Sequence, residues 1–175
     1  GVLIKHALDS GCQEIILGVG GSATNDAAAG IFQALGGSLL DKKRKQIEKG
    51  GAELCRLVSI IDPKLNKSVR WKVACDVVNP LLGKNGASTI YGPQKGASEA
   101  EIEILENSLL NFSKVIKKHF GRSISKIKGG GAAGGVAAGM FGFFNAKLFS
   151  GFTILSEIFN LESQIKSADL IFTGE

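Results

Sequence analysis

A glycine-rich stretch at residues 18–30, GVGGSATNDAAAG, follows an apolar run and precedes a segment of helical composition. The run at residues 13–19 is typical of a buried strand, and residues 25–35 predict a helix that Gly36 ends. A tight turn between a strand and a helix brings backbone N–H groups close to a ligand or to a neighbouring chain segment. The fold must therefore let a strand lead into a helix through a glycine turn.

Strand-like and helical segments alternate along the chain, which predicts an α/β fold, a layered helix and sheet domain with a largely buried sheet. Strands are expected at residues 13–19, 38–40, 70–76 and 168–174. Helices are expected at residues 2–8, 25–35, 52–60, 98–120, 136–144 and 154–165. Loops are expected at residues 79–88 and 91–97, which are rich in turn-forming residues.

The segment at residues 98–120 carries the clearest helix signal. Ser98 and Glu101 form a capping box, in which each side chain accepts a free N–H at the start of the helix. Gly121 is expected to end the helix. One apolar stripe is predicted to face the core, and it consists of Ile102, Leu105, Leu109, Phe112, Ile116 and Phe120.

Composition excludes several classes of protein. The 24 glycines of the 175 residues follow no period and only three prolines occur, so neither collagen nor a disordered linker is expected. The three cysteines form no CxxC pair, which argues against a disulfide framework or a zinc site and favours the reducing cytoplasm. No signal peptide is visible. The uncharged run at residues 129–146 contains seven glycines, which predicts a buried loop and helix and no membrane span.

The net charge of +5 favours anionic ligands. The basic run KKRK at residues 42–45 is typical of a nucleic-acid patch or of a solvated turn. No aromatic residue lies within this run, and the chain has only one Trp and one Tyr that could stack on bases. We therefore expect a solvated turn, no nucleic-acid partner and a small anionic substrate.

The glycine spacing also matches the turn of a dinucleotide-binding fold. Gly18, Gly20 and Ala23 fit the G-x-G-x-x-A pattern, and Asp41 lies about 20 residues further on, where a ribose-binding carboxylate belongs. An NAD(P)-binding Rossmann-type domain of an oxidoreductase is therefore the alternative hypothesis.

Polar residues after the glycines argue against the dinucleotide hypothesis, because the corresponding helix there starts with small apolar residues. One or two of them can cap a helix, whereas four together are typical of a loop that binds a polar or anionic ligand. No Walker A sequence is present, since GKNGAS at residues 83–88 has the right letters in the wrong order. The polar residues are Ser22, Thr24, Asn25 and Asp26.

Four segments together closely resemble, in order and spacing, the bacterial glycerate kinases of the type I family. They are ILGVGGSATND at 16–26, VACDVVNPLLG at 73–83, GASTIYGPQKGAS at 86–98 and GGGAAGGVAAG at 129–139. The segment ADLIFTGE at 168–175 fits the same pattern, so the resemblance covers essentially the whole chain. The chain is therefore expected to be an internal segment of such an enzyme, inactive on its own.

The resemblance implies ATP-dependent phosphorylation of D-glycerate to 2- or 3-phosphoglycerate, with Mg²⁺, and leaves the oligomeric state open. It also implies two α/β domains. Residues 1–167 would form the inserted domain with the glycine-rich substrate loops, and residues 168–175 a strand returning to a flavodoxin-like first domain. The family often has glycines at the positions of Ala27 and Ala28, so we expect the helix to begin promptly here, without ligand contacts at these two residues.

Phosphoryl transfer requires held phosphates, neutralised charge and an aligned hydroxyl. Asp76 follows a strand and is a catalytic candidate, either as a Mg²⁺ ligand or as the proton acceptor. Lys95, framed by glycines in GPQKG, is the catalytic candidate that would neutralise a phosphate or the glycerate carboxylate. The further candidates for substrate or phosphate binding are Gly20, Gly21, Ser22, Thr24, Asn25, Asp26, Asn79, Gln94, Gly130 and Gly131.

Structural roles remain open for several of these residues. Thr24 and Asn25 are suited to helix capping, and Asp76 and Asn79 to hydrogen bonding within the turn that follows the strand. The glycines at 129–135 can equally form a nest of N–H groups or pack tightly against a sheet. Glu175 is a further candidate metal or substrate contact, while His6 and His119 are expected to be structural.

Overall fold

The structure is a computed structural model that describes residues 1–66 and 68–174. A main sheet of three parallel strands has the order β1–β4–β5, with β1 at Glu14–Gly18, β4 at Arg70–Ala74 and β5 at Lys147–Phe149. Parallel strands place their carboxyl ends at one edge, so the chain leaves β1, β4 and β5 on the same side of the sheet. The predicted α/β class is confirmed.

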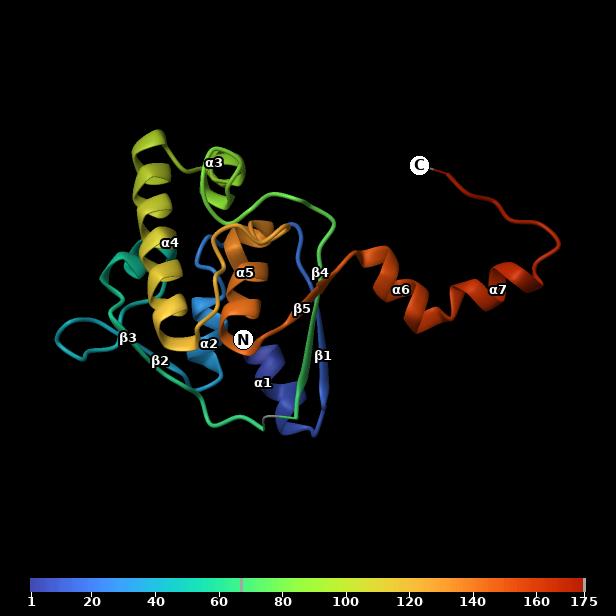
Figure 1. Cartoon of the computed structure of the whole chain (residues 1–175), viewed down its shortest axis with the longest axis horizontal. Coiled ribbons are helices and arrows are strands. Elements are labelled where there is room, and N and C mark those ends of the chain that lie inside the picture. The colour runs from blue at the N-terminus through green and yellow to red at the C-terminus, as the bar shows by residue number, and fades with distance from the viewer. Residues whose placement is uncertain (67, 175) are drawn as a thin grey trace.

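One face of this sheet packs against helices. Ile15, Trp71 and Val73 point into an apolar core that they share with α1 (Val2–Asp9), α2 (Ala29–Ala34) and α5 (Ala132–Phe144). Figure 1 shows α1, α2 and α5 grouped beside the strands. Ile16 points to the other face and remains 40% exposed. Because strand residues alternate between faces, this register fixes which side chains reach the core.

A second, two-stranded antiparallel sheet pairs β2 (Ser38–Leu40) with β3 (Ser59–Ile61). The long helix α4 (Glu99–Phe120) lies over this part of the molecule (Figure 1). Its predicted capping box forms, and Gly121 ends it with a φ of 72°. The stripe residues Leu109, Phe112 and Ile116 are completely buried, so the periodicity identified the buried face correctly.

Two predicted helices have different bounds. Residues 52–60 form the short 3-10 helix η1 (Gly51–Arg56) followed by β3, because Ile60 is buried opposite Leu39 of β2. The helix predicted from residue 25 begins only at Ala29, as α2. Ala27 and Ala28 adopt left-handed φ angles of 47° and 63°, which no helix continues through.

Other departures lie in the loops and near the C-terminus. The predicted loops contain α3 (Ala87–Tyr91) and the 3-10 helix η2 (Pro93–Lys95). Residues 154–165 form parts of two helices, α6 (Gly151–Phe159) and α7 (Leu161–Ser167), separated by Asn160 with a φ of 47°.

The strand predicted at residues 168–174 does not form, and no strand within residues 1–66 and 68–174 pairs with this segment to complete its hydrogen bonds. Figure 1 shows α6, α7 and the following segment extending away from the body. None of the helices in the described ranges is both long and apolar enough to span a bilayer.

Candidate functional site

The glycine turn lies at the carboxyl edge of the main sheet, directly after β1. Gly20, Gly21 and Ser22 line a small cavity of about 150 Å³, together with Tyr91 and Lys95. Gly21 has a φ of 56°, a left-handed backbone conformation that favours glycine. Gly20 has no such requirement, and a methyl group there would meet no atom within 4 Å. The open space at Gly20 is therefore available to a ligand.

Lys95 holds its ammonium group against the polar part of the loop. Its Nζ atom donates to Ser22 Oγ at 3.2 Å and to the carbonyl oxygen of Thr24 at 2.6 Å. Burial of the ammonium lowers the pKa of Lys95, and the nearby carboxylate of Asp26 opposes this effect. Two of the three ammonium protons are engaged, so one remains for an anion at the edge of the cavity.

Some polar residues of the loop line the cavity, and others make hydrogen bonds that stabilise the fold. Thr24 Oγ1 donates to Asp26 Oδ1 at 2.8 Å, while Asp26 Oδ2 accepts the N–H of Gly30 at 2.9 Å in the first turn of α2. Asn25 Nδ2 donates to the hydroxyl of buried Ser88 at 3.0 Å, and Asn25 Oδ1 is buried without a partner in the described structure. Asp26 thus acts as a helix cap here, and Ser22 is the polar side chain that joins Lys95 in lining the small cavity.

The second glycine cluster packs against this loop. The N–H of Ala27 donates to the carbonyl of Gly134 at 3.1 Å. A methyl group at Gly134 would overlap the carbonyl of Thr24, and one at Gly139 would overlap the carbonyl of Ala27. Because both alanines of the loop are left-handed, glycine suits their positions, and the expectation that a helix starts promptly there is wrong.

Gly130 and Gly131 also use their backbone groups within the protein. The N–H of Gly130 donates to the carbonyl of Ile127, and that of Gly131 to the carbonyl of Asn79, each at 2.9 Å. Both glycines are buried, and a methyl group at Gly131 would overlap the carbonyl of Pro80. Of the two readings of this cluster, these contacts favour tight packing.

Asp76 and Asn79 follow β4 at the same edge of the sheet. Asp76 Oδ1 accepts the N–H of Gly151 at 2.9 Å, at the start of α6. Asn79 Nδ2 donates to the carbonyl of Asn85 at 3.0 Å, and its Oδ1 accepts the hydroxyl of Tyr91 at 2.7 Å. Asp76 lines a separate cavity of about 280 Å³, so the structure does not bring Asp76 and Lys95 into one cavity.

Among the described residues, Asp76 is the only carboxylate that lines its cavity, so it cannot form a complete protein cage for a metal ion. Residues 1–66 and 68–174 contain no cluster of three or more His, Cys, Asp or Glu side chains that could hold a metal. Asp76 Oδ2 makes no hydrogen bond within the same ranges, whereas both oxygens of Asp26 are engaged. Mg²⁺ in phosphate-binding sites often takes only one or two carboxylates, together with phosphates and waters. Glu175 lies outside the described residues.

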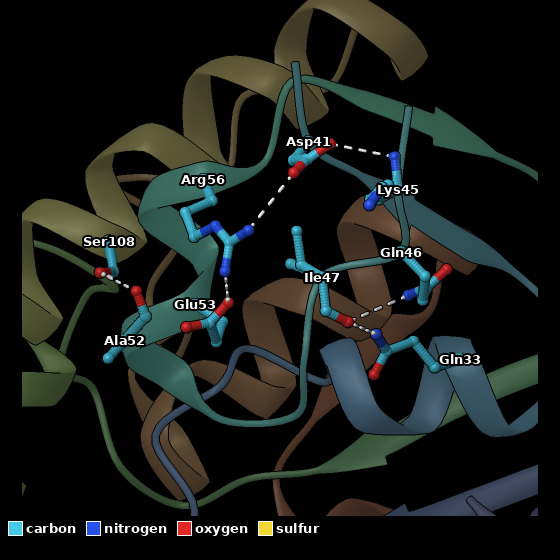
Figure 2. A network of polar contacts seen from close by, with 9 residues as sticks. All are labelled: Gln33, Asp41, Lys45, Gln46, Ile47, Ala52, Glu53, Arg56 and Ser108. Carbon is cyan, nitrogen blue, oxygen red and sulfur yellow. Dashed lines mark hydrogen bonds and ion pairs between the residues drawn. The ribbon is translucent and has the colours of Figure 1, made fainter. Parts of the chain in front are cut away.

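Asp41 does not act as a ribose-binding carboxylate, because both of its carboxylate oxygens are engaged within the protein. Its Oδ1 accepts the N–H groups of Lys43 and Lys45 at 2.8 and 2.9 Å, and its Oδ2 accepts Arg56 Nη2 at 3.3 Å. Figure 2 shows Asp41 between Lys45 and Arg56 in this network. The N–H of Lys45 is the main cause that lowers the pKa of Asp41.

The strand order of the sheet also argues against a dinucleotide-binding role for Asp41. A dinucleotide fold places the ribose-binding carboxylate after the parallel strand beside the first one. Here β4 lies beside β1, while Asp41 follows β2 in the separate antiparallel sheet. The Rossmann-type alternative is therefore wrong. The KKRK turn is exposed, as expected of a solvated turn.

The sequence prediction missed Tyr91, which lines the small cavity, and Ser88, the buried residue that holds Asn25. Both belong to α3, where a loop was expected. Tyr91 lines the small cavity and holds Asn79, and burial raises the pKa of its phenol. Gln94 lines the same cavity and is exposed. The available signal was the position of Tyr91, the single tyrosine of the sequence, directly before GPQKG.

Comparison with known proteins gives a consistent result. The model of the glycerate kinase family matches residues 1–175. The chain is 45% identical over 179 residues to the glycerate kinase of Halalkalibacterium halodurans and 49% identical over 179 residues to the glycerate 2-kinase of Escherichia coli. Each alignment covers 100% of this chain and 47% of the relative, so the chain spans about half the length of the curated relatives it matches.

A solved structure is similar over most of the chain. The crystal structure assigned to glycerate kinase 2 from Salmonella typhimurium LT2 superposes with a TM-score of 0.90 at 43% sequence identity. The match covers 95% of this chain and 46% of that one.

Proposed function

The chain belongs to the glycerate kinase family, and we propose that the protein containing it transfers a phosphoryl group from ATP to D-glycerate. The products are ADP and a phosphoglycerate. The observation that supports this most strongly is the position of Lys95, whose ammonium group is tied to the glycine loop at the carboxyl edge of a parallel sheet. Ligands of open α/β sheets bind at this edge.

Lys95 has a clear role in such a reaction. Phosphoryl transfer is catalysed mainly by positioning and by stabilising negative charge. The free ammonium proton of Lys95 would donate to the glycerate carboxylate or to the transferred phosphoryl group. Gly20 leaves room beside it, and Gln94 offers an amide for a hydroxyl of the substrate. The residues of the small cavity would therefore hold a small hydroxy acid.

Asp76 is the residue of this chain that we assign to metal binding or to proton acceptance. When bound with ATP, Mg²⁺ would neutralise phosphate charge. Asp76 Oδ2 is the oxygen that would hold the ion, since Oδ1 is engaged by the N–H of Gly151. For the same oxygen to accept the proton of the attacking hydroxyl instead, the substrate would have to extend from the small cavity past Val77, which lines both cavities.

The described chain supplies one part of the active site in this proposal. Residues 1–167 would form the inserted domain, and residues 168–175 would return to a flavodoxin-like domain that supplies the remaining contacts. The chain alone is then inactive. A cytoplasmic location agrees with Cys12, Cys55 and Cys75, which are free thiols in the described structure.

The test is an ADP-release assay on the complete protein with ATP, Mg²⁺ and D-glycerate. We expect ADP release that depends on D-glycerate, with one phosphoglycerate formed per ADP. No glycerate-dependent turnover would contradict the proposal. L-glycerate and glycerol, offered at the same concentrations, are the matched controls for the stereocentre and the carboxylate.

A further inference from the structure

Lys95 lines two cavities of very different size. The small cavity, of about 150 Å³, lies on the side of Gly20, Ser22 and Tyr91. The large cavity, of about 560 Å³, lies on the side of Thr24 and the start of α4. Within the described part of the chain, Lys95 is the only cationic side chain that lines either of them. One ammonium group is thus positioned to serve two neighbouring anionic ligands.

The two volumes suit ligands of different size. Sites for drug-sized ligands occupy roughly 300–1,000 Å³, a range that includes the large cavity and excludes the small one. A three-carbon hydroxy acid is compatible with the small cavity, whereas a nucleoside triphosphate is not. Both cavities have apolar walls, but only the large one combines an apolar wall, formed by Ile104 and Leu105, with the volume that a nucleoside needs.

A third cavity can be set aside on geometric grounds. It is larger than the other two, at about 680 Å³, and its lining includes Arg70 and Lys147. Neither Lys95 nor any residue of the glycine turn at 18–26 lines this cavity. Phosphoryl transfer requires the donor and acceptor to be in contact, and a nucleotide in this cavity would contact neither Lys95 nor the glycine turn.

We propose that the large cavity binds the nucleoside part of ATP, that the small cavity binds D-glycerate, and that Lys95 contacts both the reacting phosphate and the acceptor molecule. This assignment rests on the proposed function and adds the location of each substrate to it. The base and ribose pack against Ile104 and Leu105 of α4. The phosphates point toward Lys95, and the glycerate hydroxyl approaches from the side of Gly20 and Gln94.

A pair of exposed side chains tests the assignment without disturbing the fold. Ile104, 50% exposed, lines only the large cavity, and exposed Gln94 lines only the small one. In the complete protein, Ile104→Ala is expected to raise the KM for ATP roughly five- to thirty-fold and to leave the KM for D-glycerate unchanged. Gln94→Ala is expected to raise the KM for D-glycerate roughly two- to tenfold, with the KM for ATP unchanged.

Leu110→Ala provides the matched control, because Leu110 is 39% exposed on the same helix as Ile104 and lines neither cavity. Both KM values should equal those of the wild type in this variant. Direct titration with a fluorescent ATP analogue adds a readout that is independent of turnover, and Ile104→Ala should weaken its binding by the same factor.

The outcomes separate the two levels of the proposal. A wild-type protein with no glycerate-dependent turnover would overturn the proposed function, and the assignment with it. An active enzyme in which Ile104→Ala changes the KM for D-glycerate, or neither KM, would overturn only the assignment of the cavities. An exchange of the two effects between Ile104→Ala and Gln94→Ala would place the substrates the other way round.

Discussion

The ammonium group of Lys95 lies 2.6 Å from the carbonyl oxygen of Thr24, a residue 71 positions earlier in the chain. This contact joins the 3-10 helix η2 to the glycine loop after β1 and fixes a positive charge beside an open space. It also removes part of the water around the ammonium group. The chemistry that we propose depends on this charge, and its burial makes the charge sensitive to pH.

The first prediction concerns the alkaline limb of activity. Because burial lowers the pKa of Lys95, its ammonium group loses its proton below the ordinary lysine value of about 10.4. We expect kcat/KM of the complete enzyme to fall as pH rises through this lowered pKa. In Lys95→Arg the guanidinium stays charged, so the weaker residual activity should lack the limb. The measurement is a pH profile of kcat/KM; an identical limb in both proteins would assign it to another group.

The second prediction distinguishes glycines that pack tightly against the backbone from glycines that leave space for a ligand. A methyl group at Gly139 would overlap the carbonyl of Ala27, so Gly139→Ala should lower the free energy of unfolding by about 3 kcal/mol. Gly20→Ala meets no atom within 4 Å and should change stability by less than about 0.5 kcal/mol, yet raise the KM for D-glycerate. Urea unfolding and steady-state kinetics check the pair. Equal losses of stability would contradict the distinction.

The third prediction assigns Asp41 to stability alone. Its pKa is lowered in the folded protein, chiefly by the N–H of Lys45. The stability that it contributes is therefore present above the ordinary aspartate pKa of about 3.9 and is lost as pH falls through the lower folded value. Asp41→Asn should reduce thermal stability at neutral pH and remove this acid-dependent part, while kcat and KM stay unchanged.

Glu53→Gln is the matched control, since Glu53 contacts the same Arg56 from the exposed end of the network. A surface pair of this kind contributes little, so the melting temperature should barely move. Loss of activity in Asp41→Asn, without loss of stability, would mean that Asp41 belongs to a ligand site.

The fourth prediction distinguishes the roles of Asp76. Asn at this position still accepts the N–H of Gly151 and so keeps the start of α6, but it loses the charge. If Asp76 holds Mg²⁺, Asp76→Asn should raise the Mg²⁺ concentration for half-maximal activity roughly tenfold or more. A lower kcat with unchanged Mg²⁺ dependence would assign proton acceptance instead. If neither changes, Asp76 serves only to cap α6.

Local signals in the sequence were sufficient for part of the fold. The helix from Ser98 to Gly121 was predicted in full, because its capping box, apolar stripe and terminating glycine all act within a few residues of one another. The strand before the glycine turn was also predicted from a local signal, the apolar run at residues 13–19. Residues 52–60 were predicted wrongly, because the pairing of β3 with β2 depends on a segment some distance away in the chain.

The site depended on contacts that no local pattern contains. The glycine turn predicted a close approach of the backbone to a ligand or to a neighbouring chain segment. The structure adds that Ala27 and Ala28 contact Gly139 there. The polar residues predicted a ligand, whereas Asp26 caps α2. Lys95 was identified as a candidate from its flanking glycines, but its contact with the loop required the tertiary structure.

The most direct test of the central claim is product formation by the complete protein, wild type and Lys95→Met, with ATP, Mg²⁺ and D-glycerate. Circular dichroism should show the same fold for both. Methionine keeps much of the length of the lysine side chain and removes the charge, so phosphoglycerate formation should fall by roughly a hundred- to a thousandfold. A folded Lys95→Met enzyme that forms phosphoglycerate at the wild-type rate would contradict the account.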